Sequence, residues 1–206
     1  MIGENRKPIT DYRSPSLTAM LLAVLSDSHD HIANLRLAVT ACNAAGAELL
    51  LHCGDLISPF MLPELARFHG PVHLIYGNNA GDLHLIAQRC GTRYPGIVHH
   101  GILGIVEAGG RRLAFTHHPD LAAGLAAKGE FDLVCCGHDH THRQERVGST
   151  LLVNGGELLG KDEQPGFCLI DLETLRVQRI EVGAMMFPNT LLSTSSEKRH
   201  HEQPPG

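Results

Sequence analysis

Four short motifs rich in aspartate, histidine and asparagine follow one another along the chain, each directly after an apolar run. They are Asp27-Ser28-His29, Gly54-Asp55, Gly77-Asn78 and Gly137-His138-Asp139-His140, with Thr116-His117-His118 between the last two. Carboxylate and amide oxygens combined with imidazole nitrogens suit Mn, Fe or Zn better than they suit Mg or Ca, which prefer oxygen ligands alone. The motifs therefore indicate a metal-dependent hydrolytic site.

The spacing within the motifs suggests how side chains could converge. In an extended strand, residues i and i+2 point the same way, so Asp27 and His29 could reach one metal ion together. By the same reasoning, His138 and His140 could converge on one site.

Asp55 is the natural bridging residue, because a carboxylate can give one oxygen to each of two metals. Asn78 fits as a neutral oxygen ligand beside the second metal. Two metals roughly 3.5–4 Å apart can hold a hydroxide between them and neutralise phosphoryl oxygens during in-line attack.

Structural explanations compete with this interpretation. Asp27 and Asp55 could cap the helices that follow them, and the glycines before Asp55, Asn78 and His138 could belong to ordinary turns. A further Asp-x-His pair, Asp82 with His84, lies outside the series. The serial placement of the ligand types at the ends of apolar runs favours the metal site.

The first half of the chain alternates apolar runs with helical patterns. Strands are predicted at 21–26, 48–53 and 71–76, and helices from a cap at Asp30 to Gly46, over 59–68 and over 83–90. This alternation favours right-handed βαβ units in a largely parallel sheet. Ligands of such sheets gather beyond the carboxyl ends of the strands, where the motifs lie.

The second half changes character. Runs at 102–108 and 111–116 flank Gly109-Gly110 and predict a hairpin, followed by a helix over 119–128 and strands at 131–136 and 150–153. A last hairpin pairs 166–171 with 175–182. The predicted fold class is α/β, with two mixed β-sheets packed as a sandwich and flanked by helices. We expect a flexible N-terminal extension over 1–19, one domain over 20–186 and a disordered tail over 187–206.

Composition narrows the classes of protein. A length of 206 residues suits one domain, and a net charge of −5 gives no reason to expect nucleic-acid binding. The six cysteines form no CxxC pair and lie mostly in apolar surroundings, which predicts buried free thiols.

The apolar run from Leu17 to Leu25 is shorter than the roughly 20 residues that span a bilayer. We expect a cytoplasmic protein without a membrane segment.

The ordered set of motifs resembles the calcineurin-like metallophosphoesterase superfamily, and the short chain is similar to its small single-domain bacterial phosphodiesterases. The resemblance covers about residues 20–182. It implies a hydrolase that cleaves phosphodiester bonds through a metal-bridging hydroxide in a dinuclear site. The implied cofactors are two divalent transition-metal ions, Mn first, with Zn or Fe as alternatives. The implied substrate is a small phosphate ester, for which a nucleotide is one candidate, and a homo-oligomer is compatible with the family.

The resemblance also implies a role for each motif residue. The first metal would be held by Asp27, His29, Asp55 and His140, and the second by Asp55, Asn78, His117 and His138. Either His117 or His118 could be the ligand; we favour His117, with His118 facing the substrate as a candidate proton donor. Many relatives place a histidine and an acid after Asn78, whereas this chain has Asn79 and Ala80, so the general acid is open. Asn154 resembles the asparagine of a loop beside the site in small members.

Two other functions fit the same fold. One is a phosphomonoesterase that uses the same site. The other is a non-catalytic scaffold that binds partner proteins, as a eukaryotic retromer subunit of the superfamily does. A pure scaffold has no need of His29 and His140, so their presence favours the enzyme.

Overall fold

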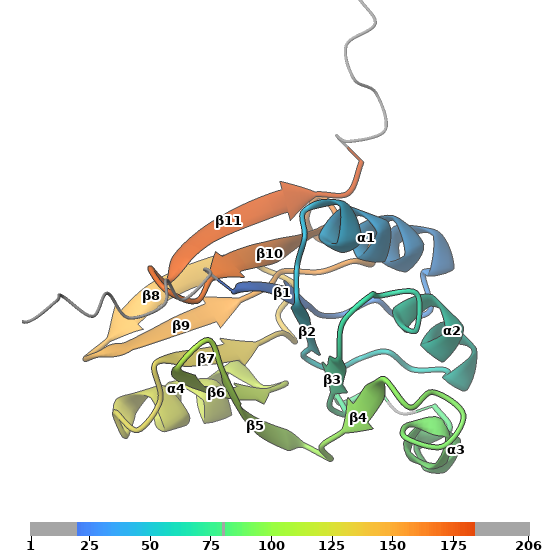
Figure 1. The fold of residues 1–206 in the computed structure, drawn as a ribbon, viewed down its shortest axis with the longest axis horizontal. Coiled ribbons are helices and arrows are strands. Elements are labelled where there is room, and N and C mark those ends of the chain that lie inside the picture. Colours follow the sequence, from blue (N-terminus) through green and yellow to red (C-terminus); the bar gives the residue numbers. More distant parts are fainter. Residues whose placement is uncertain (1–19, 80, 184–206) are drawn as a thin grey trace, which may run out of the picture.

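Two β-sheets pack face to face in the computed structural model, which describes residues 20–79 and 81–183 (Figure 1). The first sheet has the spatial order β11 (Arg176–Glu181), β10 (Gly166–Asp171), β1 (Leu21–Leu25), β2 (Leu49–His52), β3 (Val72–Leu74) and β4 (Ile97–His99). The second has the order β5 (Leu103–Ala108), β6 (Arg111–Thr116), β7 (Leu133–Cys136), β9 (Thr150–Asn154) and β8 (Arg143–Val147). The expected extension and tail, at 1–19 and 187–206, lie outside the described residues.

Helices cover the outer faces of both sheets, so the molecule has four layers (Figure 1). The helices of the first sheet are α1 (Ile32–Ala44), the 3₁₀ helix η1 (Pro59–Met61), α2 (Leu62–Leu65) and α3 (Leu83–Arg89). The second sheet is covered by α4 (Pro119–Ala127). The predicted fold class, a flanked sandwich of two mixed sheets, is confirmed.

Strand β2 shows how side-chain alternation builds these layers. Leu50 packs with the helices of the first sheet, whereas Leu49 and Leu51 belong to the core between the two sheets. Phe115 of β6 meets them from the other side and is completely buried. A smaller core, which includes the buried Ala122, joins α4 to the outer face of the second sheet. Because side chains alternate along a strand, one apolar run supplies two cores.

Parallel pairing brings the motif-bearing strand ends to one edge. Strands β1, β2, β3 and β4 are parallel neighbours, as are β6, β7 and β9, while β10, β11, β5 and β8 pair antiparallel. The ends of β1, β2 and β3 therefore meet the ends of β6, β7 and β9 across the sandwich.

Two local predictions are wrong. The helix expected over 59–68 is divided into η1 and the short α2, because Pro63 has no N–H and its ring does not fit a helix interior. The expected cap, Asp30, has a left-handed φ of 60° and accepts hydrogen bonds from the backbone and hydroxyl of Ser58. His31 caps α1 instead, since its Nδ1 accepts from the N–H of Asn34 at 3.2 Å.

The sequence patterns did not predict β4 and β8. The first has only three residues, and the second is an edge strand whose side chains are mostly exposed and polar. Such strands carry little apolar signal, because their pairing comes from the neighbouring strand rather than from burial.

All six cysteines are free and buried, which confirms the expectation of structural thiols. Burial raises the pKa of the Cys136 and Cys168 thiols to about 12, so they are protonated at neutral pH.

The described part of the chain contains no helix with the length and apolar character that a membrane span requires.

The core between the sheets makes Leu51 a test of the architecture. Leu51→Ala should lower the free energy of unfolding by about 2–5 kcal/mol, because it opens a cavity between two layers that cannot easily collapse. Urea denaturation followed by circular dichroism measures the change. The matched control is Leu121→Ala on α4, where the side chain is 54% exposed and little loss is expected. Equal losses in the two variants would contradict the layer assignment.

Candidate metal site

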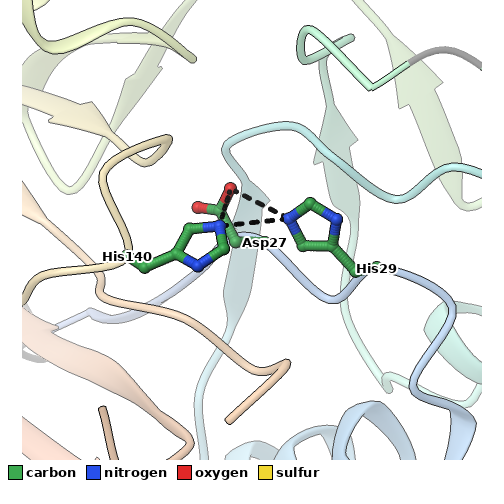
Figure 2. Close-up of side chains that lie close together, drawn as sticks. All are labelled: Asp27, His29 and His140. Atoms are coloured by element: carbon green, nitrogen blue, oxygen red, sulfur yellow. Dashed lines mark hydrogen bonds and ion pairs between the residues drawn. The ribbon is translucent and has the colours of Figure 1, made fainter. Parts of the chain in front are cut away.

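The motif residues gather at the edge where the two sheets meet. Asp27, Asp55 and Asn78 follow β1, β2 and β3 of the first sheet, while His117 and the 138–140 loop follow β6 and β7 of the second. Figure 2 shows Asp27 between His29 and His140, which approach it from opposite sides. Residues up to 113 positions apart in the sequence, from Asp27 to His140, thus form one cluster.

The backbone at these positions is unusual. Asp27, His29, Asp55, His138 and His140 all have positive φ, at 51°, 40°, 53°, 79° and 58°. Residues in this left-handed region are not part of an extended strand. The predicted strand alternation of the Asp-x-His and His-x-His pairs is therefore wrong. Non-glycine residues in this region cost free energy and persist where the surrounding structure determines them, commonly at functional sites.

One group of donor atoms surrounds Asp27. Its Oδ1 lies 3.7 Å from His29 Nε2 and 3.6 Å from His140 Nε2, and the two imidazole nitrogens are 3.2 Å apart (Figure 2). His29 Nε2 is also 3.5 Å from Asp55 Oδ2. We call these four residues the first donor set. Asp27 Oδ1 is buried and has no hydrogen-bond partner among the described residues, so it faces the imidazoles free to act as a ligand.

A second group surrounds Asn78. Its Oδ1 lies 2.7 Å from both His117 Nε2 and His138 Nδ1, and His117 Nε2 is 3.4 Å from Asp55 Oδ2. We call Asp55, Asn78, His117 and His138 the second donor set. The expectation that His138 and His140 converge on one site is not met, because His138 faces the second set and His140 the first.

Asp55 belongs to both sets through the same oxygen, Oδ2. Although burial acts to raise the pKa of Asp55, hydrogen bonds from His117 and Asn79 outweigh it and hold that pKa well below its usual range. Asn79 donates its backbone N–H to Oδ1 and its side-chain amide to Oδ2, at 2.9 and 2.5 Å. Asn79 therefore orients the shared carboxylate and keeps it ionised, a role that the sequence did not reveal.

Helix capping does not explain the aspartates of the two sets. Asp27 Oδ2 accepts from the backbone N–H of His138 at 2.9 Å, which ties β1 to the loop after β7. Asp55 is held by Asn79 as described. By contrast, Asp82 outside the series is a helix cap, since its side chain accepts from the N–H of Leu85 at the start of α3.

Two motif glycines are needed for close approach rather than for turns. Gly77 and Gly137 do not have positive φ. A Cβ on Gly77 would overlap the Asp55 carboxylate, and one on Gly137 would overlap Ser26 Oγ and Asp27 Oδ2. The third motif glycine, Gly54, has both a positive φ, of 100°, and a close neighbour, because an added Cβ would lie 2.6 Å from His117 Nδ1. The absence of side chains lets the strand ends close around the carboxylates.

His117 and His140 each have a polar partner at Nδ1, the ring nitrogen that points away from the donor sets. His117 Nδ1 donates to the carbonyl oxygen of Cys53 at 2.8 Å, which leaves Nε2 as the lone-pair nitrogen facing the second set. His140 Nδ1 lies 3.1 Å from both Glu157 Oε2 and Asp162 Oδ2. Glu157 is a second residue beside the donor sets that no sequence motif marks.

Asn154 is hydrogen-bonded to the loop that carries residues 138–140. Its amide nitrogen donates to the carbonyl of Gly137 at 2.9 Å and to Asp139 Oδ1 at 2.6 Å. Asn154 does not belong to either donor set, so its role beside the site is to position this loop.

His118 lies next to the second set without belonging to it. Its ring packs edge-on against His138 and His117, with centroid distances of 4.6 and 5.2 Å. Burial, followed by the nearby His117 and His138, lowers the pKa of His118. Between His117 and His118, the geometry therefore brings His117 to the donor atoms.

Four further histidines of the described residues lie apart from the donor atoms. His52 is completely buried against Ser28, and burial lowers its pKa to about 4. His73 Nδ1 and His100 Nε2 contact each other at 2.7 Å between β3 and the end of β4. His142 faces the carbonyl of Asn154.

The two sets fit cations. Asp27 and Asp55 are buried at 0% and 2% exposure, and the only ionic partners that the described residues offer them are histidines. Uncompensated buried carboxylates are costly, and mixed oxygen and nitrogen donors are those that transition metals prefer. A polar cavity of about 450 Å³, lined in part by His29, Asn79 and His138, opens over both sets.

Comparison with known proteins agrees with this geometry. The model of the calcineurin-like phosphoesterase superfamily domain matches residues 20–175. The chain is 32% identical over 148 residues to phosphodiesterase MJ0936 of Methanocaldococcus jannaschii, which covers 68% of this chain and 86% of that protein. The protein belongs to the calcineurin-like phosphoesterase superfamily and is a hydrolase of that family.

Solved structures share the fold. A structure described as a novel archaeal phosphodiesterase has a TM-score of 0.73 and 28% identity, covering 79% of this chain and 99% of that one. Vps29 of Entamoeba histolytica in complex with Zn²⁺ has a TM-score of 0.57 and 16% identity, covering 79% and 99%. At the latter identity the likeness shows the shared fold alone.

The close packing around Gly137 can be tested directly. Gly137→Ala should displace the Asp27 carboxylate, lower the free energy of unfolding and shift the histidine side-chain NMR signals of the first donor set. Gly124→Ala is the control, because it lies in α4 with open space around it and should be neutral or stabilising by up to about 1 kcal/mol. A Gly137→Ala protein with unchanged stability and histidine signals would show that the loop tolerates a side chain.

Proposed function

We propose that this protein is a metal-dependent phosphodiesterase that uses two divalent transition-metal ions, with Mn as the first choice and Zn or Fe as alternatives. The observation that carries the proposal is the pair of donor sets that share the buried Asp55 carboxylate. The name phosphodiesterase of the archaeal relative supports the choice of reaction.

In this proposal each donor set holds one ion. The first ion takes Asp27, His29, Asp55 and His140, and the second takes Asp55, Asn78, His117 and His138. The first sheet supplies three residues of the first set and two of the second, and the second sheet supplies the others, so both sheets must be folded before either ion can bind well. Asp55 would contribute to both sites, because its Oδ2 lies near a histidine of each set.

Two bound ions would supply a water nucleophile active near neutral pH and positive charge for the phosphoryl oxygens. The protein contributes the fixed geometry and the surroundings. Asn79 holds Asp55, the Cys53 carbonyl holds His117, and the cavity above the sets admits a small phosphate ester. A nucleotide is one candidate substrate.

His118 is the candidate proton donor for the leaving group. It borders the second set, and neither ring nitrogen is needed as a ligand in the proposed assignment. Since its pKa is lowered, His118 is protonated mainly below its ordinary pKa of about 6.5. Proton donation by His118 should therefore be strongest on the acidic side of neutrality.

The shared carboxylate gives the decisive test of the proposal. Wild-type protein reconstituted with Mn should contain about two ions per chain by elemental analysis. Asp55→Asn preserves the shape of the side chain but removes its charge, so it should lose metal and reduce turnover of an aryl phosphodiester by orders of magnitude.

Asp82→Asn is the matched control, because asparagine also caps a helix well and Asp82 lies outside both sets. Equal damage from the two substitutions, or a metal content near zero in the wild type, would overturn the assignment. A monoester assayed in parallel separates a phosphodiesterase from the alternative monoesterase.

A second prediction concerns the leaving group. His118→Ala should slow cleavage of an alkyl phosphodiester, up to about 10²–10⁴-fold, and spare an activated aryl diester whose leaving group departs without a proton. The difference should shrink as the pH rises above about 6.5, since His118 is then neutral.

His84→Ala, at an exposed position on α3, is the control for that experiment. Metal content must be measured in both variants. Loss of metal in His118→Ala would identify His118 as a ligand, and equal slowing of both substrates with metal retained would exclude it as the acid.

A further inference from the structure

Glu157 is a buried carboxylate whose place in the fold the family assignment leaves unexplained. Four carboxylates among the described residues are buried: Asp27, Asp55, Glu64 and Glu157. Glu64 is paired with two arginines, Arg36 and Arg67. Glu157 is completely inaccessible, and the only ionic partner that the described residues offer it is His140.

The two oxygens of Glu157 face in different directions. Oε1 accepts backbone N–H groups of Asp162 and Glu163, at 2.5 and 2.7 Å, and so holds the loop that carries Lys161 at the rim of the cavity. Oε2 makes no hydrogen bond within the described chain and lies 3.1 Å from His140 Nδ1, which also has none. These two buried atoms therefore lie within hydrogen-bond distance of each other.

The position of Glu157 is fixed by the strand ends around it. Its carbonyl accepts from the N–H of Gly166 at the start of β10. The next residue, Leu158, donates its N–H toward the carbonyls of Ser26 and Asp27 at 3.2 Å. The backbone that carries Glu157 is therefore attached to the same strand end that carries the first donor set.

We propose that Glu157 is a positioning residue for the first metal ion. Its Oε2 accepts the Nδ1 proton of His140, which leaves His140 Nε2 as the lone-pair nitrogen directed at Asp27 and His29. This inference rests on the proposed function, because it takes His140 to be a ligand of the first ion. A carboxylate on the far side of a ligating histidine fixes the tautomer and the ring orientation and increases the donor strength of the imidazole.

A purely structural role, in which Glu157 only holds the 162–163 backbone, makes a different prediction. In Glu157→Gln the amide oxygen can still accept both N–H groups of the loop. The amide NH₂ would then face His140 Nδ1 and donate to it, which moves the imidazole proton to Nε2, the nitrogen required for the metal. The substitution thus preserves the loop and reverses the tautomer. Replacing a buried carboxylate by an amide beside a histidine is known to select the wrong tautomer without disturbing geometry.

The experiment measures metal binding as well as turnover. Mn and Zn titrations by calorimetry should show that Glu157→Gln weakens binding of one of the two ions by about 10–100-fold and leaves the other near its wild-type affinity. Circular dichroism and the backbone NMR signals of residues 159–163 should remain those of the wild type.

Glu163→Gln is the matched control, since Glu163 lies in the same loop but pairs with Arg179 and the N–H of His142, away from His140. Asp162→Asn tests the other carboxylate near Nδ1; because Asp162 is half exposed, we expect a smaller effect. Equal loss of metal affinity in Glu163→Gln and Glu157→Gln would assign the effect to the loop and overturn the inference.

The wild-type protein provides a readout that does not depend on any variant's folding. Nitrogen-edited NMR of the Zn-loaded protein should show His140 in the Nδ1–H tautomer, with that proton slow to exchange because it is buried against Glu157. A rapidly exchanging Nδ1 proton, or the opposite tautomer, would overturn the inference.

His140→Ala separates the failure of this inference from failure of the proposed function. If His140→Ala weakens one ion and Glu157→Gln does not, the metal assignment holds and the positioning role fails. If His140→Ala leaves both ions bound, the proposed ligand set is wrong and the positioning role falls with it.

Discussion

The structure depends on placing three carboxylates, Asp27, Asp55 and Glu157, in a buried edge where the described residues offer them only histidines as ionic partners. Burying ionised carboxylates is costly, and the imidazoles around them can serve as ligands only when they are neutral. Divalent cations would satisfy both demands, since they compensate the negative charge and take the lone pairs of the histidines. The need for such compensation explains why histidine, rather than lysine or arginine, surrounds these groups.

The backbone places these carboxylates and histidines together by adopting strained, left-handed conformations. Left-handed residues cluster where the strands end, and Gly77 and Gly137 leave room for the carboxylates of Asp55 and Asp27. Three cores behind the edge, one between the sheets and one under the helices of each sheet, provide the burial that sustains such positions. The same rigidity keeps the donor atoms near one another before any ligand arrives, which reduces the free-energy cost of ordering them on binding.

The shared fold and the donor sets carry different information about function. Vps29 has the same architecture at 16% identity, and that likeness alone says nothing of catalysis. In our proposal, the chemistry resides in the two sets that share Asp55 and in the groups beside them, Asn79, the Cys53 carbonyl and Glu157. The loop whose backbone donates to Glu157 also lines the cavity above the sets.

The fold class, most strands and the identity of the clustered residues could be predicted from the sequence, because apolar periodicity and the position of polar residues after apolar runs are local properties of the chain. The sequence did not determine that β8 and β4 form, because an edge strand depends on its neighbour. The alternation of side chains along an extended strand also gave the wrong reason for the Asp-x-His pairing. The left-handed backbone at these residues depends on the packing of both sheets. Glu157 and Asn79 acquire their roles only through contacts across 17 and 24 positions, to His140 and Asp55, and nothing in their local sequence marks them. These features depend on the packing of distant parts of the chain, because the free energy of a buried charge depends on which groups surround it.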